Sequence, residues 1–128
     1  MIVLDASVVI AFLDASDPHH ERAVRMIESH AADGFAMHPL TLAEVLVGAV
    51  RIGRAARLLA DLRVMGVRTH APSEDEPLTL AELRADTGLK MPDCCVLTVA
   101  TQQPGPLATF DDQLARAAAE LGVAVLRD

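Results

Sequence analysis

Four acidic residues of this chain stand where a carboxylate could do chemistry. Asp5 ends the apolar stretch "MIVLD", Glu44 interrupts the apolar run "PLTLAEVLVGAV", Asp93 follows "KMP", and Asp111 follows "PLATF". A charge at the edge of a core is costly unless it is paired or has a function. Carboxylate oxygens without Cys or His partners suit hard cations such as Mg²⁺ or Mn²⁺. If the fold brings these acids together, they predict a divalent-metal site.

Each acid also has a purely structural interpretation. Asp5, Asp93 and Asp111 each precede or begin an expected helix, where Asp is a favoured cap and the helix dipole attracts negative charge. Glu44 could point into solvent beside Thr41. Taken singly, the structural interpretation is preferred for each acid, so the functional hypothesis depends on a shared location.

The elements that must position the acids alternate between short apolar strands and helices. Strands are expected at 2–4, 35–37, 67–70, 106–109 and 123–126. Helices are expected at 6–13, 18–31, 39–50, 54–65, 74–86, 92–102 and 111–121. This alternation predicts an α/β fold in which helices cover both faces of a parallel sheet. There is no internal repeat or linker, so residues 1–128 are expected to form a single domain.

The expected fold gives the four acids a common location. In parallel sheets, ligands bind in a crevice at the carboxyl ends of the strands, near the point where the strand order reverses. Asp5 follows the first strand and Asp111 lies just beyond the fourth, while Glu44 and Asp93 lie on helices expected beside that crevice. Clustered like charges are tolerable when a cation neutralises them. The shared location therefore favours a metal site over four independent caps.

The four acidic stretches, taken in order, resemble the four acidic motifs of PIN-domain ribonucleases. The resemblance rests on Asp5-Ala6-Ser7 after a strand, Glu44 in "LAEVL", Asp93 in "MPDCCVLTVAT", and Thr109-Phe110-Asp111 after a strand. The chain is most similar to the VapC-type toxins of bacterial toxin–antitoxin pairs. This implies a three-layer α/β/α fold around a five-stranded parallel sheet. It also implies an endoribonuclease dependent on Mg²⁺ or Mn²⁺, a VapB-like antitoxin partner and a homodimer.

The resemblance implies a role for each acid. Asp5 and Asp93 would be the principal metal ligands, and Glu44 would complete the site or bind through water. Asp111 would hold a second ion or orient metal-bound water. Whether one or two ions bind is left open.

The same resemblance implies roles for residues beside the acids. Ser7 and Thr109 would steady carboxylates or waters through their hydroxyl groups. Asp111 and Asp112 are adjacent, so either could be the fourth acid. The family pattern places its acid two residues after the threonine, which favours Asp111 and leaves Asp112 as a cap or an outer acid.

Composition limits the partners of the chain. Its formal net charge is −7, which repels nucleic acid in bulk, and three Phe are its only aromatic residues. An RNA substrate therefore requires a bound cation or a local basic patch. Arg51, Arg54 and Arg57 could form such a patch, although a solvated helix face is the preferred interpretation of these arginines, and Lys90 is a separate candidate for a phosphate contact.

Targeting signals are also lacking in the sequence. There is no apolar run of membrane-spanning length and no leader pattern, so we expect a cytoplasmic protein that does not contact membranes. Two other enzyme classes fit poorly. An aspartyl-phosphate phosphatase needs a second acid where Ser7 stands, and a phospho-receiver domain needs paired acids after the first strand. The remaining alternative to a nuclease is a catalytically silent PIN-like module that binds another protein.

Overall fold

The computed structural model describes residues 1–128 and has five parallel strands in one sheet, in the order β3-β2-β1-β4-β5. The strands are Ile2–Leu4 (β1), Phe35–Met37 (β2), Val67–Thr69 (β3), Leu107–Ala108 (β4) and Val125–Leu126 (β5). The helices are Ala6–Leu13 (α1), His20–Ser29 (α2), Pro39–Arg51 (α3), Ala55–Val64 (α4), Glu76–Thr87 (α5), Met91–Gln102 (α6) and Asp112–Glu120 (α7). The predicted five-stranded parallel α/β fold is confirmed.

Several expected boundaries were wrong at element ends. The second helix begins at His20 rather than at residue 18, because the backbone N–H of His19 bonds the side chain of Asp17 in a turn. The last strand lacks residues 123–124, since the N–H of Val123 bonds the carbonyl of Ala118 and closes α7. The fourth strand is shorter by one residue at each end than expected. Such ends depend on single hydrogen bonds that apolar patterning does not report.

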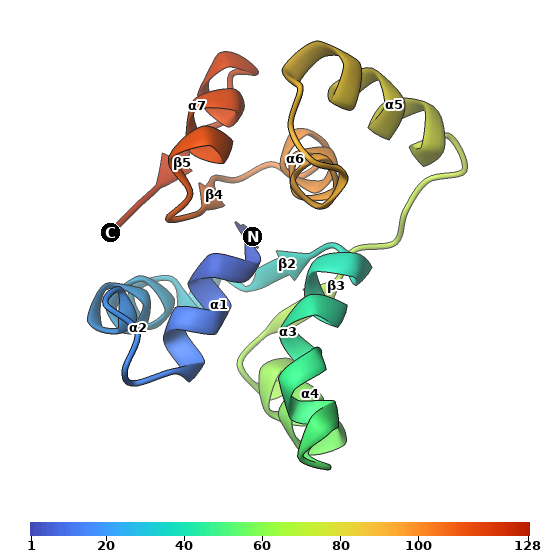
Figure 1. Cartoon of the computed structure of the whole chain (residues 1–128). Helices are drawn as coiled ribbons and strands as arrows, with labels where there is room; N and C mark the ends of the chain where they lie inside the picture. Colours follow the sequence, from blue (N-terminus) through green and yellow to red (C-terminus); the bar gives the residue numbers. More distant parts are fainter.

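The sheet separates two apolar cores. Along β1, Ile2 and Leu4 pack on one side and Val3 on the other, as the twofold period of a strand requires. Side chains of α1 to α4 complete the first core, and side chains of α6 and α7, with α5 packed against them, complete the second. Figure 1 shows the two helical layers on opposite sides of the strands. This is the predicted three-layer α/β/α arrangement.

The strand order creates a switch point beside β1. From β1 the chain builds β2 and β3 on one side, then crosses over to build β4 and β5 on the other. The order therefore reverses between β1 and β4, whose carboxyl ends are neighbours because Leu4 pairs with Ala108. Asp5 follows β1 and Thr109 follows β4, so both lie where such folds bind ligands. The helices are all too short or too polar to cross a bilayer.

Candidate active site

Asp5 is held by two hydroxyl groups. Its Oδ2 accepts hydrogen bonds from Ser7 Oγ at 2.7 Å and from Thr109 Oγ1 at 2.8 Å. Although Asp5 occupies the position before α1, its side chain makes no capping bond, so the capping interpretation was wrong for this residue. The residue is buried, yet its Oδ1 receives no hydrogen bond and is not sealed from solvent. One carboxylate oxygen is therefore fixed and the other is free to bind a ligand.

The same two hydroxyls bind the loop that follows β4. Ser7 Oγ accepts the backbone N–H of Phe110 at 3.2 Å, and Thr109 Oγ1 accepts that of Asp111 at 3.0 Å. Each hydroxyl thus donates to the carboxylate of Asp5 and accepts from the loop. Bonds to a charged acceptor are roughly twice as strong as neutral ones, so this network couples the loop carrying Asp111 to Asp5.

Asp93 lies within the electrostatic reach of the other three acids. It stands in the first turn of α6 and is partly buried. Burial raises the pKa of its carboxyl group, and the negative charges of Asp111, Asp5 and Glu44 raise it further, while Lys90 opposes them. Like charges raise a carboxyl pKa only when they are close. The other three acids predicted from the sequence therefore lie near Asp93, and we call the four together the acid cluster.

Glu44 and Asp111 reach the acid cluster from exposed positions. Glu44 lies on α3 and its charge also raises the pKa of Cys95. Asp111 Oδ1 accepts the backbone N–H of Leu114 at 2.8 Å and so caps α7. Asp111 therefore caps α7, as its structural interpretation predicted, and also lies close enough to Asp93 to act on its charge.

The donor set of the acid cluster fits a hard cation. Its potential donors are all carboxylate oxygens, which Mg²⁺ and Mn²⁺ prefer. A cation there would relieve the repulsion that acts on Asp93, and the Oδ1 of Asp5, which accepts no hydrogen bond, would be available to coordinate it. The side chains do not close on one point, because no group of three or more His, Cys, Asp or Glu residues has the spacing to hold an ion. The acid cluster thus gathers negative charge without forming a finished ligand cage.

The sequence of the chain matches a protein-family model. The model for the PIN domain matches residues 2–120, which includes all four members of the acid cluster. The chain belongs to the PIN domain family. The family predicted from the acidic motifs is thereby confirmed.

Solved structures similar to this PIN domain include bacterial toxins. A toxin–antitoxin complex from Klebsiella pneumoniae has 22% identity and a TM-score of 0.75 over 99% of this chain and 97% of that chain. VapC20 of Mycobacterium tuberculosis, a toxin that cleaves the sarcin-ricin loop, has 19% identity and a TM-score of 0.76 over the full length of both chains. FitAcB from Neisseria gonorrhoeae has 22% identity and a TM-score of 0.73, over 99% of this chain and 97% of that one. No curated protein sequence matches the chain.

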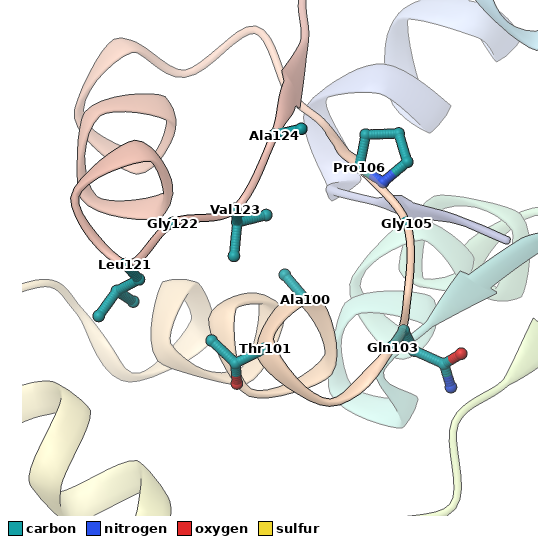
Figure 2. A pocket seen from close by; sticks show the side chains of 9 residues that line it. All are labelled: Ala100, Thr101, Gln103, Gly105, Pro106, Leu121, Gly122, Val123 and Ala124. Atoms are coloured by element: carbon teal, nitrogen blue, oxygen red, sulfur yellow. The ribbon is translucent and has the colours of Figure 1, made fainter.

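The hollows on the surface of the PIN domain lie away from the acids. None of the three is lined by a member of the acid cluster, so the crevice expected there is not a marked depression. One hollow lies at the opposite, amino edge of the sheet, between the end of α6 and the residues before β4 and β5 (Figure 2). Only Thr101 and Gln103 supply polar side chains there, and none of its nine residues is ionisable. That hollow has no group for acid–base or metal chemistry.

The predicted basic patch is not brought to the acid cluster. Arg51, Arg54 and Arg57 are exposed on and between α3 and α4, and Arg57 forms an ion pair with Asp61. Among cationic side chains only that of Lys90 acts on Asp93. The arginines therefore form a solvated helix face, and Lys90 is the cation beside the acids.

Sequence reasoning missed a buried hydrogen bond between a histidine and a glutamate near the same edge of the sheet. His38 follows β2, and its Nε2 donates to Glu76 Oε1 at 2.6 Å. Its Nδ1 accepts the N–H of Leu40, which caps α3 and fixes the proton on Nε2. Both residues are buried, and their link ties the start of α5 to the sheet. A histidine before a proline-initiated helix is a recognisable cap, but no pattern in the sequence points to Glu76 as its partner.

Proposed function

We propose that the chain is a divalent-metal-dependent endoribonuclease and the toxin of a type II toxin–antitoxin pair. The observation that carries the proposal is that the charges of Asp5, Glu44 and Asp111 all act on the carboxyl group of Asp93 and raise its pKa. Membership of the PIN domain family supports a nuclease. The likeness to toxins that include an RNA-loop-cleaving member supports RNA as the substrate.

The acids have distinct tasks in this proposal. Asp5 and Asp93 are the principal ligands, with Glu44 and Asp111 completing the donor set from α3 and from the start of α7. Bound Mg²⁺ or Mn²⁺ would lower the pKa of its water and neutralise charge on the phosphate. Ser7 and Thr109 hold one oxygen of Asp5 so that the other stays directed to the ligand. Asp93 must be deprotonated to bind, which requires a pH above its raised pKa.

Charge supports the dependence on a cation. At a net charge of −7 the chain repels an RNA backbone, and the acid cluster adds negative charge where the phosphate would bind. Lys90 is the cationic side chain beside Asp93, and it lowers the pKa of that carboxyl. A divalent cation bound by the acids would reverse the sign of the local charge and let the phosphate approach.

An apolar surface supports an antitoxin partner. Val47, Val50 and Ile52 are about half to two-thirds exposed, with exposed fractions of 47%, 63% and 67%. Ile52 also lines a hollow shared with Leu13 of α1 and Leu58 of α4. Large exposed apolar side chains gathered on one surface mark interaction sites. An apolar antitoxin segment would cover them, and an arginine carried by it could pair with the acid cluster. A homodimer and a cytoplasmic location are part of the same proposal.

The proposal is tested by cleavage of single-stranded RNA with the purified chain. We expect cleavage with Mg²⁺ or Mn²⁺, none with EDTA, and a loss of most of the rate in Asp5→Asn, whose fold is checked by circular dichroism. Asp33→Asn, which removes an exposed carboxylate from the turn before β2, at the amino edge of the sheet, is the matched control and should cleave normally. Cleavage that survives both EDTA and Asp5→Asn would exclude the mechanism.

The partner is tested separately by co-expression. The open reading frame adjacent to the gene should encode a protein that co-purifies with this chain and suppresses its cleavage of RNA. Val50→Asp should weaken this association, because it buries a charge in the apolar contact. A chain that is harmless when expressed alone and retains no partner would contradict the toxin assignment.

A further inference from the structure

Asp111 and Asp112 are neighbours in sequence with opposite surroundings. The side chain of Asp111 caps α7 and its charge acts on Asp93. The side chain of Asp112 is directed to a cation instead, because its Oδ1 lies 2.7 Å from Nη2 of Arg127. Asp112 is not among the charges that act on Asp93. The structure thus gives different surroundings to two acids between which the sequence alone decides only by a family pattern.

Arg127 binds the chain on both sides of Asp111. The same Nη2 that meets Asp112 donates to the backbone carbonyl of Phe110 at 2.9 Å. The contact with Asp112 is thus an ion pair and the contact with Phe110 a hydrogen bond, both made by the same nitrogen. Arg127 directly follows β5, where Leu126 pairs with Ala108 and the N–H of Thr109 bonds the carbonyl of Leu126. The register of the last strand therefore delivers this arginine to the loop after β4.

A second arginine, Arg22, holds the backbone at Arg127 in place. Arg22 of α2 donates through Nη2 to the backbone carbonyl of Arg127, and its Nε pairs with Asp128 at 3.0 Å. Its guanidinium carbon also lies 4.9 Å from the centre of the Phe110 ring, a cation–π contact. The carbonyl and the ring of Phe110 are consequently held by two arginines that come from opposite ends of the chain sequence.

We infer that Arg127 is a positioning residue, which binds Phe110 and Asp112 and thereby selects Asp111, rather than Asp112, as the fourth acid of the cluster. Its consequence for catalysis rests on the proposed function. Nη2 is occupied by a hydrogen bond to Phe110 and an ion pair with Asp112, so Arg127 acts on the loop rather than on an RNA phosphate. Without Arg127, Asp112 has no counter-charge. The loop then loses the hydrogen bond at Phe110 and the ion pair at Asp112, which lie on either side of Asp111.

The inference is tested first without metal or RNA, by amide hydrogen exchange in Arg127→Ala. The amides of Asp111 and Leu114 bond Thr109 and Asp111 respectively, so they report the loop and its cap. We expect both to exchange about tenfold faster or more, as the loss of a hydrogen bond to a charged group predicts, while amides of α4 keep their rates. Unchanged exchange at the loop, or an equal increase in α4, would overturn the inference.

Kinetics provide the second test. Arg127→Ala should lower kcat for RNA by about 10- to 100-fold, the usual effect of removing an outer partner of a ligand, and leave KM unchanged. Arg127→Lys keeps the charge but loses the planar guanidinium group, so its kcat should lie between those of the wild type and Arg127→Ala. If the alanine variant does not fold, the lysine variant is used for both tests. Arg25→Ala removes an exposed arginine of α2 and is the control. A raised KM with unchanged kcat would make Arg127 a phosphate contact and overturn the inference. If the wild type cleaves no RNA, the proposed function fails and the exchange data alone decide.

Discussion

Thr109 Oγ1 donates a 2.8 Å hydrogen bond to Asp5 Oδ2 and joins residues that are 104 positions apart. The bond spans the carboxyl ends of β1 and β4, where the strand order reverses. Thr109 has no exposed surface and Asp5 retains only 7% of its own, so solvent barely competes for the bond. The carboxylate is thereby pre-oriented by two strands and does not depend on a flexible loop.

Replacing Thr109 by Val should distinguish the contribution of its hydroxyl group from that of its side-chain volume. The variant removes a donor to Asp5 and an acceptor for the N–H of Asp111 at nearly constant volume. We expect the free energy of unfolding to fall by about 1–3 kcal/mol, which urea denaturation measures. RNA cleavage should fall by about 10- to 100-fold because a supporting partner of Asp5 is lost. Thr79→Val on the exposed face of α5 is the control, and an equal loss there would refute the role of Thr109.

Asp93→Asn should stabilise the metal-free protein while it abolishes cleavage. Burial and three negative charges raise the pKa of Asp93 above its ordinary 3.8, so the folded protein binds that proton more tightly than the unfolded chain does. The stability contributed by the proton is complete below 3.8 and is lost as the pH rises through the raised pKa. Near neutral pH the variant should gain about 1 kcal/mol or less, because solvent screens a partly buried group.

Thermal melts in EDTA at several pH values check this prediction. The excess Tm of Asp93→Asn should be largest near pH 7 and should shrink as the pH falls through the raised pKa. Mg²⁺ should raise the Tm of the wild type by mass action and that of the variant much less. A variant that melts lower than the wild type in EDTA, with equal Mg²⁺ shifts for both proteins, would make Asp93 a structural cap.

Two substitutions at Asp111 should distinguish its cap from its charge. Asn is also a favoured cap, so Asp111→Asn keeps the acceptor for Leu114 and removes only the charge. Asp111→Ala removes both and should cost about 1 kcal/mol of stability. We expect both variants to lose cleavage, with only the alanine variant melting lower. Full activity in the asparagine variant would reduce Asp111 to a capping residue.

The buried pair of His38 and Glu76 should be costly to break from one side. Its atoms lie 2.6 Å apart, and both residues are below 10% exposed. Glu76→Ala or His38→Ala should each destabilise the fold by about 3 kcal/mol or more, because the partner is left buried. The double variant should cost less than the sum, by about 0.5–3 kcal/mol. His70→Ala is the control, and additive losses would show that the pair is not coupled.

Cys95 should be inert to thiol reagents in the folded protein. Burial and the charges of Glu76, Cys94 and Glu44 raise the pKa of its thiol to about 11, and burial raises that of Cys94 as well. At pH 8 only about one thiol in a thousand is then a thiolate, the reactive form. An absorbance assay with an aromatic disulfide should detect no reaction before unfolding and two thiols after it. Reaction of the native protein at the unfolded rate would contradict this environment.

Much of this architecture follows from local sequence patterns. Short apolar runs such as 2–4 and 35–37 are too short for helices and lie between segments of helical period, which indicates buried strands, so the parallel α/β sheet was predictable. Asp5 and Asp111 were identified because each directly follows or closely follows such a run. The ordered set of four acidic motifs, each recognisable from its neighbouring residues, was sufficient to predict the PIN family.

The contacts between distant residues were decided only by the tertiary structure. The order β3-β2-β1-β4-β5 and its register bring Thr109 to Asp5 and Arg127 to Asp112, and no local pattern encodes which strands become neighbours. The hydrogen bond between His38 and Glu76 depends on where α5 returns to the sheet. Local periodicity reports which face of an element is buried, whereas the identity of a hydrogen-bond partner depends on how all the elements pack together.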